Sequence, residues 1–203
     1  MGRTLISNIG EFFTGDLASP MAPISALLIE GGRIAQIAPK IKPTAEVTVE
    51  DCGSALALPG LVDAHAHLDK TLWGMPWHPH QQGKSLQQMI DTERALRHEL
   101  DMDAERQSAR QVALSLSKGT TAIRTHVDID TEHGLSLHRG VAATRARYAD
   151  VMQIEIVAFP QSGLMIRPGT LELMDQALRE GADRAANRID QQIAVALAPL
   201  VDA

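Results

Sequence analysis

The first part of the chain alternates apolar and polar positions over short stretches, the period-two pattern typical of β-strands. Strands are expected over residues 4–9, 26–37 and 45–49. The middle stretch predicts a hairpin, because the Gly31-Gly32 pair tolerates the positive φ of a two-residue turn and apolar residues flank it on both sides. Three or four strands this close together predict a small, β-sandwich-like domain or a single small sheet over residues 1–57, with no cluster of catalytic residue types.

From residue 58 onward, apolar runs alternate with stretches in which apolar residues recur at helical spacing. Strands are expected around residues 58–67, 120–129 and 151–160. Helices are expected over residues 85–100, 103–118, 135–150 and 170–179, the last with Thr170 as its cap. Residues 72–84 contain both tryptophans together with prolines and glycines, so they predict a loop, which is a candidate lid over a bound substrate.

This order of elements predicts parallel strands joined by crossover helices. In such folds, and above all in a closed (β/α)₈ barrel, functional groups collect at the C-terminal ends of the strands. Here those ends carry His65 and His67, His126 and Asp128, and Gln161. Three successive strands therefore deliver polar side chains to one rim.

The spacing of His65 and His67 suits a metal site. Side chains alternate faces along a strand, so both imidazoles leave the same side. Two neutral imidazoles at the end of a buried strand can hold a divalent ion such as Zn²⁺ or Fe²⁺ and leave positions open for other ligands and a water. Such spacings also arise by chance at strand ends, but the Pro59-Gly60 turn, the apolar run after it and Asp69 favour the metal interpretation.

Each of the other histidines can also be interpreted as a structural or surface residue. His126 and Asp128 share a face, and they either line the same pocket as His65 and His67 or form a structural hydrogen-bonded pair. His78 and His80 also stand two apart, but the proline between them and the flanking glycines favour a surface loop. We expect the remaining histidines to be exposed: His98, His133 and His138.

Composition narrows the class of partner. The chain has 203 residues, of which 44% are hydrophobic, so it can bury a core. Its formal net charge of -6 argues against a nucleic-acid or anionic-membrane surface, and we expect a small-molecule partner. The single cysteine, Cys52, excludes an internal disulfide and a Cys-rich zinc cluster, so His, Asp or Glu must hold any metal. We expect a cytoplasmic protein, because no export leader or long apolar run is present.

Four stretches carry a family resemblance. They are residues 59–71 (PGLVDAHAHLDKT), 124–128 (RTHVD), 153–163 (QIEIVAFPQSG) and 177–183 (ALREGAD). Their order along the chain is far more specific than any one of them. Together they resemble the cytosine deaminase-like branch of the amidohydrolase superfamily, a group that also includes N-isopropylammelide amidohydrolase.

The resemblance implies a small β domain beside a distorted (β/α)₈ barrel, one divalent metal ion, Fe or Zn, and hydrolytic loss of an amine from a cytosine-like nitrogen heterocycle. By position, His65 and His67 resemble the first two metal ligands, and Gln161 resembles the group that recognises the ring amide of the substrate. Such a metal ion lowers the pKa of its water toward neutrality for attack on the ring carbon. A glutamine amide can both donate to and accept from a lactam or amidine edge.

The resemblance also implies a further His and Asp as ligands and a proton-shuttling Glu on later strands, so the general acid/base is expected beyond Ala203. After Asp183 the resemblance fades, since residues 184–192 are charged and their pattern is more helical than β. We therefore expect about three strand-helix units of an incomplete barrel over residues 58–203, with an atypical tail from about 184. This predicts the N-terminal portion of the enzyme, through truncation, frameshift or a split gene, inactive in isolation.

A second class of function stays open. The chain could be a non-catalytic binding or assembly subunit that needs a partner to complete the barrel. A three-strand piece of a parallel barrel leaves strand edges and apolar faces uncovered. Either interpretation therefore predicts self-association or the binding of a complementing fragment.

Overall fold

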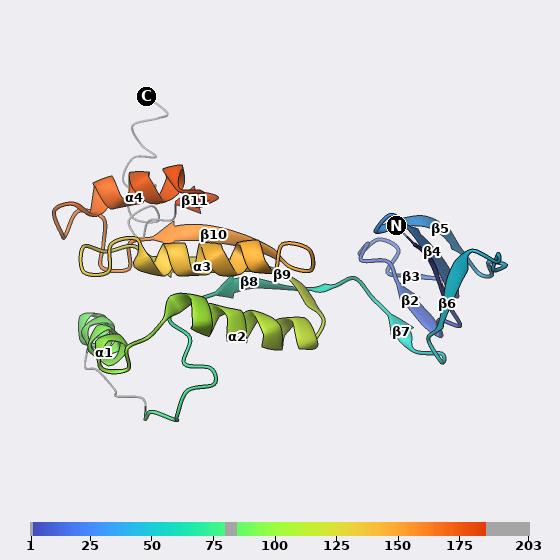
Figure 1. Ribbon diagram of the computed structural model, residues 1–203, viewed down its shortest axis with the longest axis horizontal. Helices are drawn as coiled ribbons and strands as arrows, with labels where there is room; N and C mark the ends of the chain where they lie inside the picture. The colour runs from blue at the N-terminus through green and yellow to red at the C-terminus, as the bar shows by residue number, and fades with distance from the viewer. Residues whose placement is uncertain (1, 80–84, 186–203) are drawn as a thin grey trace. The chain divides into compact units, whose positions relative to one another are not determined.

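The computed structural model describes residues 2–79 and 85–185, and the chain divides into two compact units at the Gly60–Leu61 bond (Figure 1). The described part of the N-terminal unit contains strands and no helix. The second unit combines a parallel sheet with helices. The expectations for His80, for the rest of 80–84 and for the tail from residue 186 lie outside the described residues.

The N-terminal unit contains a sheet in the order β5-β4-β1-β6 and a smaller one in the order β3-β2-β7. The strands are β1 (Arg3–Ser7), β2 (Glu11–Phe13), β3 (Met21–Ala22), β4 (Ala26–Glu30), β5 (Arg33–Ala38), β6 (Val47–Asp51) and β7 (Leu56–Ala57). The predicted hairpin is confirmed, because β4 and β5 are antiparallel and Gly31 and Gly32 have φ angles of 58° and 77°. Strands β2, β3 and β7 are too short to show an alternating pattern, so the sequence does not predict them.

The second unit is built on a parallel sheet in the order β11-β10-β9-β8. Its strands are β8 (Leu61–Ala66), β9 (Thr120–Asp128), β10 (Gln153–Phe159) and β11 (Arg184–Ala185). Within the described ranges the sheet is open rather than a closed barrel. Residues 184 and 185 form strand β11, which differs from the more helical pattern expected of them. Its two residues are charged or small because they lie exposed at the sheet edge, where pairing with β10 does not require an apolar run.

In the described ranges, four helices connect these strands: α1 (Leu86–Glu99), α2 (Ala104–Ser117), α3 (Ser136–Arg147) and α4 (Thr170–Arg179). Ser85 and Asp103 cap α1 and α2 by accepting hydrogen bonds from Gln88 N and Arg106 N, which explains why the sequence predicts both starts correctly. Thr170 is the first residue of α4 and not its cap; Gly169 precedes it with a φ of 93°, in the left-handed region that favours glycine. None of the described helices meets the length and apolarity needed to cross a membrane.

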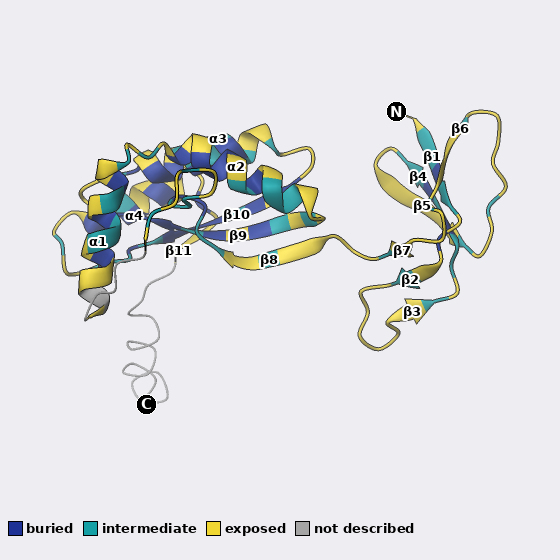
Figure 2. Ribbon diagram, turned by 90° about the horizontal axis from the view of Figure 1, so that it is seen from below, coloured by how far each residue is buried: buried dark blue, intermediate teal, exposed yellow. Residues whose placement is uncertain are grey.

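The helices lie along one face of the sheet, and their inward sides are buried (Figure 2). Val112 of α2 and Val141 of α3 pack with Val127 of β9 in the main core, and all three are fully buried. Because side chains alternate along a strand, His126 points to the face of the sheet away from these helices. The core thereby sets which side of β9 carries the polar site.

Two of the three histidines expected to be exposed depart from that expectation. The expectation that His138 is exposed is wrong, because the packing of α3 buries this side chain completely. His133 is half-buried and stacks on His98 with ring centroids 5.0 Å apart. His98 is exposed, as expected, and its Nε2 lies 2.7 Å from Glu132 Oε1.

Candidate metal and substrate site

Three imidazoles gather where β8 and β9 lie side by side. The ring centroids of His65 and His67 are 5.4 Å apart, and the ring of His126 lies 4.3 Å from His65 and 5.9 Å from His67. The parallel pairing of β8 with β9 brings these positions together although about sixty residues separate them in the sequence. His126 thus lies beside the pair that the sequence singles out.

The hydrogen bond at His67 sets the orientation of its ring. His67 Nδ1 lies 2.9 Å from the backbone carbonyl oxygen of His126, so Nδ1 carries the proton and donates it. This leaves Nε2 with a free lone pair, the arrangement in which a histidine binds a metal ion while its other nitrogen is held by a second group. The Nδ1 atom of His126 is buried and has no hydrogen-bond partner within the described structure.

The surroundings favour neutral rings. Burial, followed by the positive charge of Lys70, lowers the pKa of His67 to about 4. Burial and the neighbouring His65 lower the pKa of His126 in the same direction. At pH 7 both rings are therefore unprotonated, which is the state that a metal ion requires.

Two buried carboxylates stand behind the histidines. Asp69 Oδ2 accepts a hydrogen bond from the backbone N–H of Asp128, at 2.9 Å, and Asp128 Oδ1 accepts one from the backbone N–H of Gln161, at 3.2 Å. Burial raises the pKa of Asp69 to about 6 and raises that of Asp128 as well. Asp128 therefore joins three strand ends, and its contacts are those of a structural residue.

Gln161 lies at the end of β10 and faces a cavity of about 560 Å³, which Leu72, His78 and Glu93 also line. This volume lies in the range of small-ligand pockets. The Gln161 amide oxygen accepts a hydrogen bond from Lys70 Nζ, which is also 3.1 Å from Glu93 Oε1. Trp73 and Trp77 are exposed and absent from this lining, whereas His78 Nε2 is buried and unpaired within the described ranges.

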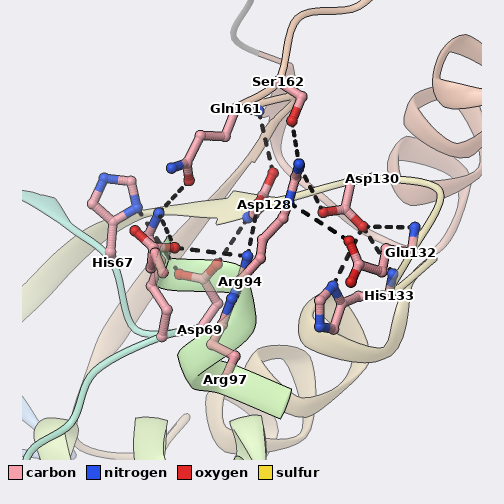
Figure 3. Close-up of polar contacts among 12 residues, drawn as sticks. His67, Asp69, Arg94, Arg97, Asp128, Asp130, Glu132, His133, Gln161 and Ser162 are labelled. Carbon is pink, nitrogen blue, oxygen red and sulfur yellow. Dashed lines mark hydrogen bonds and ion pairs between the residues drawn. The ribbon is translucent and has the colours of Figure 1, made fainter. Parts of the chain in front are cut away.

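Helix α1 contributes two buried arginines that the sequence analysis does not single out. Arg97 reaches Asp128 Oδ2 at 3.3 Å, and Arg94 reaches Asp130 Oδ2 at 3.0 Å and contacts Ser162 (Figure 3). The sequence contains a pattern that indicates their burial, because Ile90, Arg94 and Arg97 have the spacing of one helix face and Ile90 is buried. Charged residues on an apolar stripe indicate buried partners.

A different group of side chains also has the spacing of an ion site. Ligand atoms of Asp130, Glu132 and His133 all lie within 4.8 Å of one another, the one such group in the part of the chain that the structure describes. Arginine side chains already neutralise it, with Arg94 at 3.0 Å from Asp130 and Arg167 at 3.8 Å from Glu132. These positive charges disfavour a metal cation there.

Curated relatives cover most of this chain but only part of their own length. The chain is 36% identical over 157 residues to the uncharacterized protein YahJ of Escherichia coli K12, covering 76% of the chain and 34% of YahJ. It is 28% identical over 162 residues to the N-isopropylammelide isopropyl amidohydrolase of Pseudomonas sp. strain ADP, covering 76% and 39%. The chain thus spans a little over a third of these relatives, and no family model matches it.

Solved structures match nearly the whole chain. The N-isopropylammelide isopropylaminohydrolase of Burkholderia multivorans superposes with a TM-score of 0.80 at 42% identity, covering 91% of this chain and 44% of that one. The 5-methylcytosine deaminase of Klebsiella pneumoniae gives 0.68 at 26% identity, covering 90% and 43%. Enamidase, described as a member of the amidohydrolase superfamily, shares the fold with a TM-score of 0.52 at 19% identity. By its homologues and structural neighbours, this chain belongs to the amidohydrolase superfamily and fits the N-terminal portion of its members.

Proposed function

We propose that this chain supplies the metal-binding edge and part of the substrate pocket of a hydrolase that cleaves a C–N bond of a cytosine-like nitrogen heterocycle. Its relatives include proteins named as an amidohydrolase and as a deaminase, which supports this reaction class. The observation that carries the proposal is the group of three imidazoles with His67 Nδ1 bonded to a backbone carbonyl.

His65 and His67 would hold one divalent ion, Fe or Zn. Their fit rests on the free Nε2 of His67 and on the neutral state of its half-buried ring. The ring of His126, whose buried Nδ1 lacks a partner among the described residues, has its centroid 4.3 Å from that of His65. When bound, such an ion supplies Lewis-acid activation of water near neutral pH.

The chain's own residues would orient the substrate rather than complete the reaction. Gln161 offers its amide to the ring edge beside the cavity, and Asp69 and Asp128 hold the strand ends that carry His67 and Gln161. No described carboxylate is assigned as the proton shuttle. We therefore expect the isolated chain to bind metal without turnover, consistent with its covering only 34% and 39% of the two curated relatives.

Metal titration tests this proposal. Wild-type chain loaded with Zn²⁺ and dialysed should retain about one ion per chain by elemental analysis. His65→Ala and His67→Ala should each weaken binding by more than about tenfold. His133→Ala is the matched control, because it removes one imidazole from the competing group with Asp130 and Glu132. Retention in His67→Ala together with loss in His133→Ala would place the ion in that group and refute the assignment.

The exposed position of β8 favours one alternative. Among the described strands, β8 pairs only with β9, and its Leu61 and Val62 are 48% and 68% exposed. A non-catalytic binding or assembly subunit, completed by a partner chain, would expose such an edge before assembly. The same titration separates the two functions, since a wild-type chain that retains no metal supports the non-catalytic one.

A further inference from the structure

Lys70 determines whether the oxygen or the nitrogen of the Gln161 side-chain amide is free to contact a substrate. Its Nζ contacts Gln161 Oε1. An ammonium group has donors and no acceptor, so the amide oxygen, and not the amide nitrogen, must face it. The chemistry of this contact thereby distinguishes two amide orientations that have nearly the same shape.

Both partners in this contact are held in place. The Lys70 side chain is only 10% exposed, and its Nζ lies 3.1 Å from Glu93 Oε1. Glu93 in turn lies 3.7 Å from Arg97 on the same helix. The backbone N–H of Gln161 is bonded to the buried Asp128. Figure 3 shows the amide nitrogen of Gln161 on the side of the His67 ring.

We propose that Lys70 is a positioning residue that turns Gln161 into a donor-only contact for the substrate. The site then selects a heterocycle through an acceptor, a ring carbonyl oxygen or an unprotonated ring nitrogen, and gains nothing from a lactam N–H. A second donor at Gln161 Oε1 would bring its positive hydrogen next to the Lys70 ammonium. This inference depends on the proposed function, because that function supplies the heterocyclic substrate. It replaces the expectation that the Gln161 amide both donates to and accepts from the substrate with donation alone.

The orientation itself is tested without ligand, by NMR of the isotopically labelled full chain. In Lys70→Met the Gln161 side-chain carbonyl ¹³C signal should move upfield, because the oxygen loses a charged donor. Lys70→Arg keeps donors at this position and should preserve the wild-type shift. Lys118→Met removes the same charge from an exposed site at the end of α2 and is the matched control. An unchanged signal in Lys70→Met would overturn the contact.

The selectivity is tested with 2-pyridone, which has a lactam N–H, and N-methyl-2-pyridone, which has only the carbonyl acceptor. The wild-type chain, Lys70→Arg and Lys118→Met should bind the two with similar affinity. Lys70→Met should favour 2-pyridone by about fivefold, the effect expected of one added hydrogen bond. A wild-type chain that already shows this preference overturns the proposal. If neither probe binds to the wild-type chain or to any variant, the assignment of the substrate pocket is refuted. The metal titration tests the proposed function independently of these binding measurements.

Discussion

His138 shows how burial of a single side chain couples folding to pH. It is fully buried on α3, and neither ring nitrogen has a hydrogen-bond partner within the described structure. Burial lowers the pKa of its ring, so the unfolded chain binds the proton more readily than the folded chain. This contribution to stability is complete above about pH 6.5, the unfolded value, and is lost as the pH falls below it.

We predict that His138→Leu removes the part of the loss of stability at low pH that comes from protonation of this ring. At about pH 7.5 the free energy of unfolding should change by no more than about 1 kcal/mol, because two unpaired polar atoms leave the core. Urea unfolding at about pH 7.5 and about pH 5.5 measures the difference, which should be smaller than in the wild type. Leu178→Ala, at an exposed position of α4, changes no titratable group; it is the control and should keep the wild-type difference. An equal difference in His138→Leu would refute the role of this ring.

Some residue positions are predictable from the sequence because strand and helix periods determine them. The shared face of His65 and His67 follows from the two-residue strand period. The burial of His138 also has a signal, since the buried Leu137 and Val141 share one face of α3 and His138 lies at the edge of that face. The contact of Lys70 with Gln161 has no such signal, because it joins residues 91 positions apart through the packing of two loops.

Helix α1 is attached to the sheet by charge as well as by apolar contact. Arg97 is 4% exposed and lies 3.3 Å from Asp128, whose carboxylate also holds the backbone of Gln161. A buried carboxylate that loses its positive partner is strongly destabilising, because its charge remains away from water. The ion pair therefore links the position of α1 to the strand ends of the candidate site.

We predict that Arg97→Met lowers the free energy of unfolding by about 3 kcal/mol. Adding Asp128→Asn should recover part of this loss, because the double variant contains no uncompensated carboxylate at that position. Arg106→Met, at an exposed position near the start of α2, is the control and should change stability by less than about 0.5 kcal/mol. Chemical denaturation gives all the values. Additive losses in the double variant would show that the two side chains do not interact.

At the scale of elements, the sequence predicts those whose ends have their own signals. Ser85 and Asp103 mark the starts of α1 and α2, and the Gly31-Gly32 turn marks the hairpin. Strand β11 escapes prediction because its two residues are held by parallel pairing with β10 and not by an apolar pattern of their own. Short edge strands depend on their neighbours, and a local pattern does not show the neighbour.

At the scale of the whole molecule, the described sheet of the second unit has an apolar edge at β8. Strand β8 ends the described sheet order, and it carries His65 as well as the exposed Leu61 and Val62. An exposed strand edge offers unpaired backbone groups to another chain, and apolar side chains beside it add a hydrophobic contribution. The same edge would be covered if further strands, from this protein or from a partner, extended the sheet.

We predict that the wild-type chain self-associates through β8. Sedimentation velocity over about 10 to 100 µM should show an average mass that rises with concentration. Val62→Lys should shift the population toward monomer, because a charge at an exposed strand edge opposes pairing with another chain. Leu17→Lys, at a 97% exposed position in the N-terminal unit, introduces the same charge outside the sheet that contains β8 and should leave association unchanged. A wild-type chain that sediments as a single monomer throughout this range would show that the edge does not drive assembly.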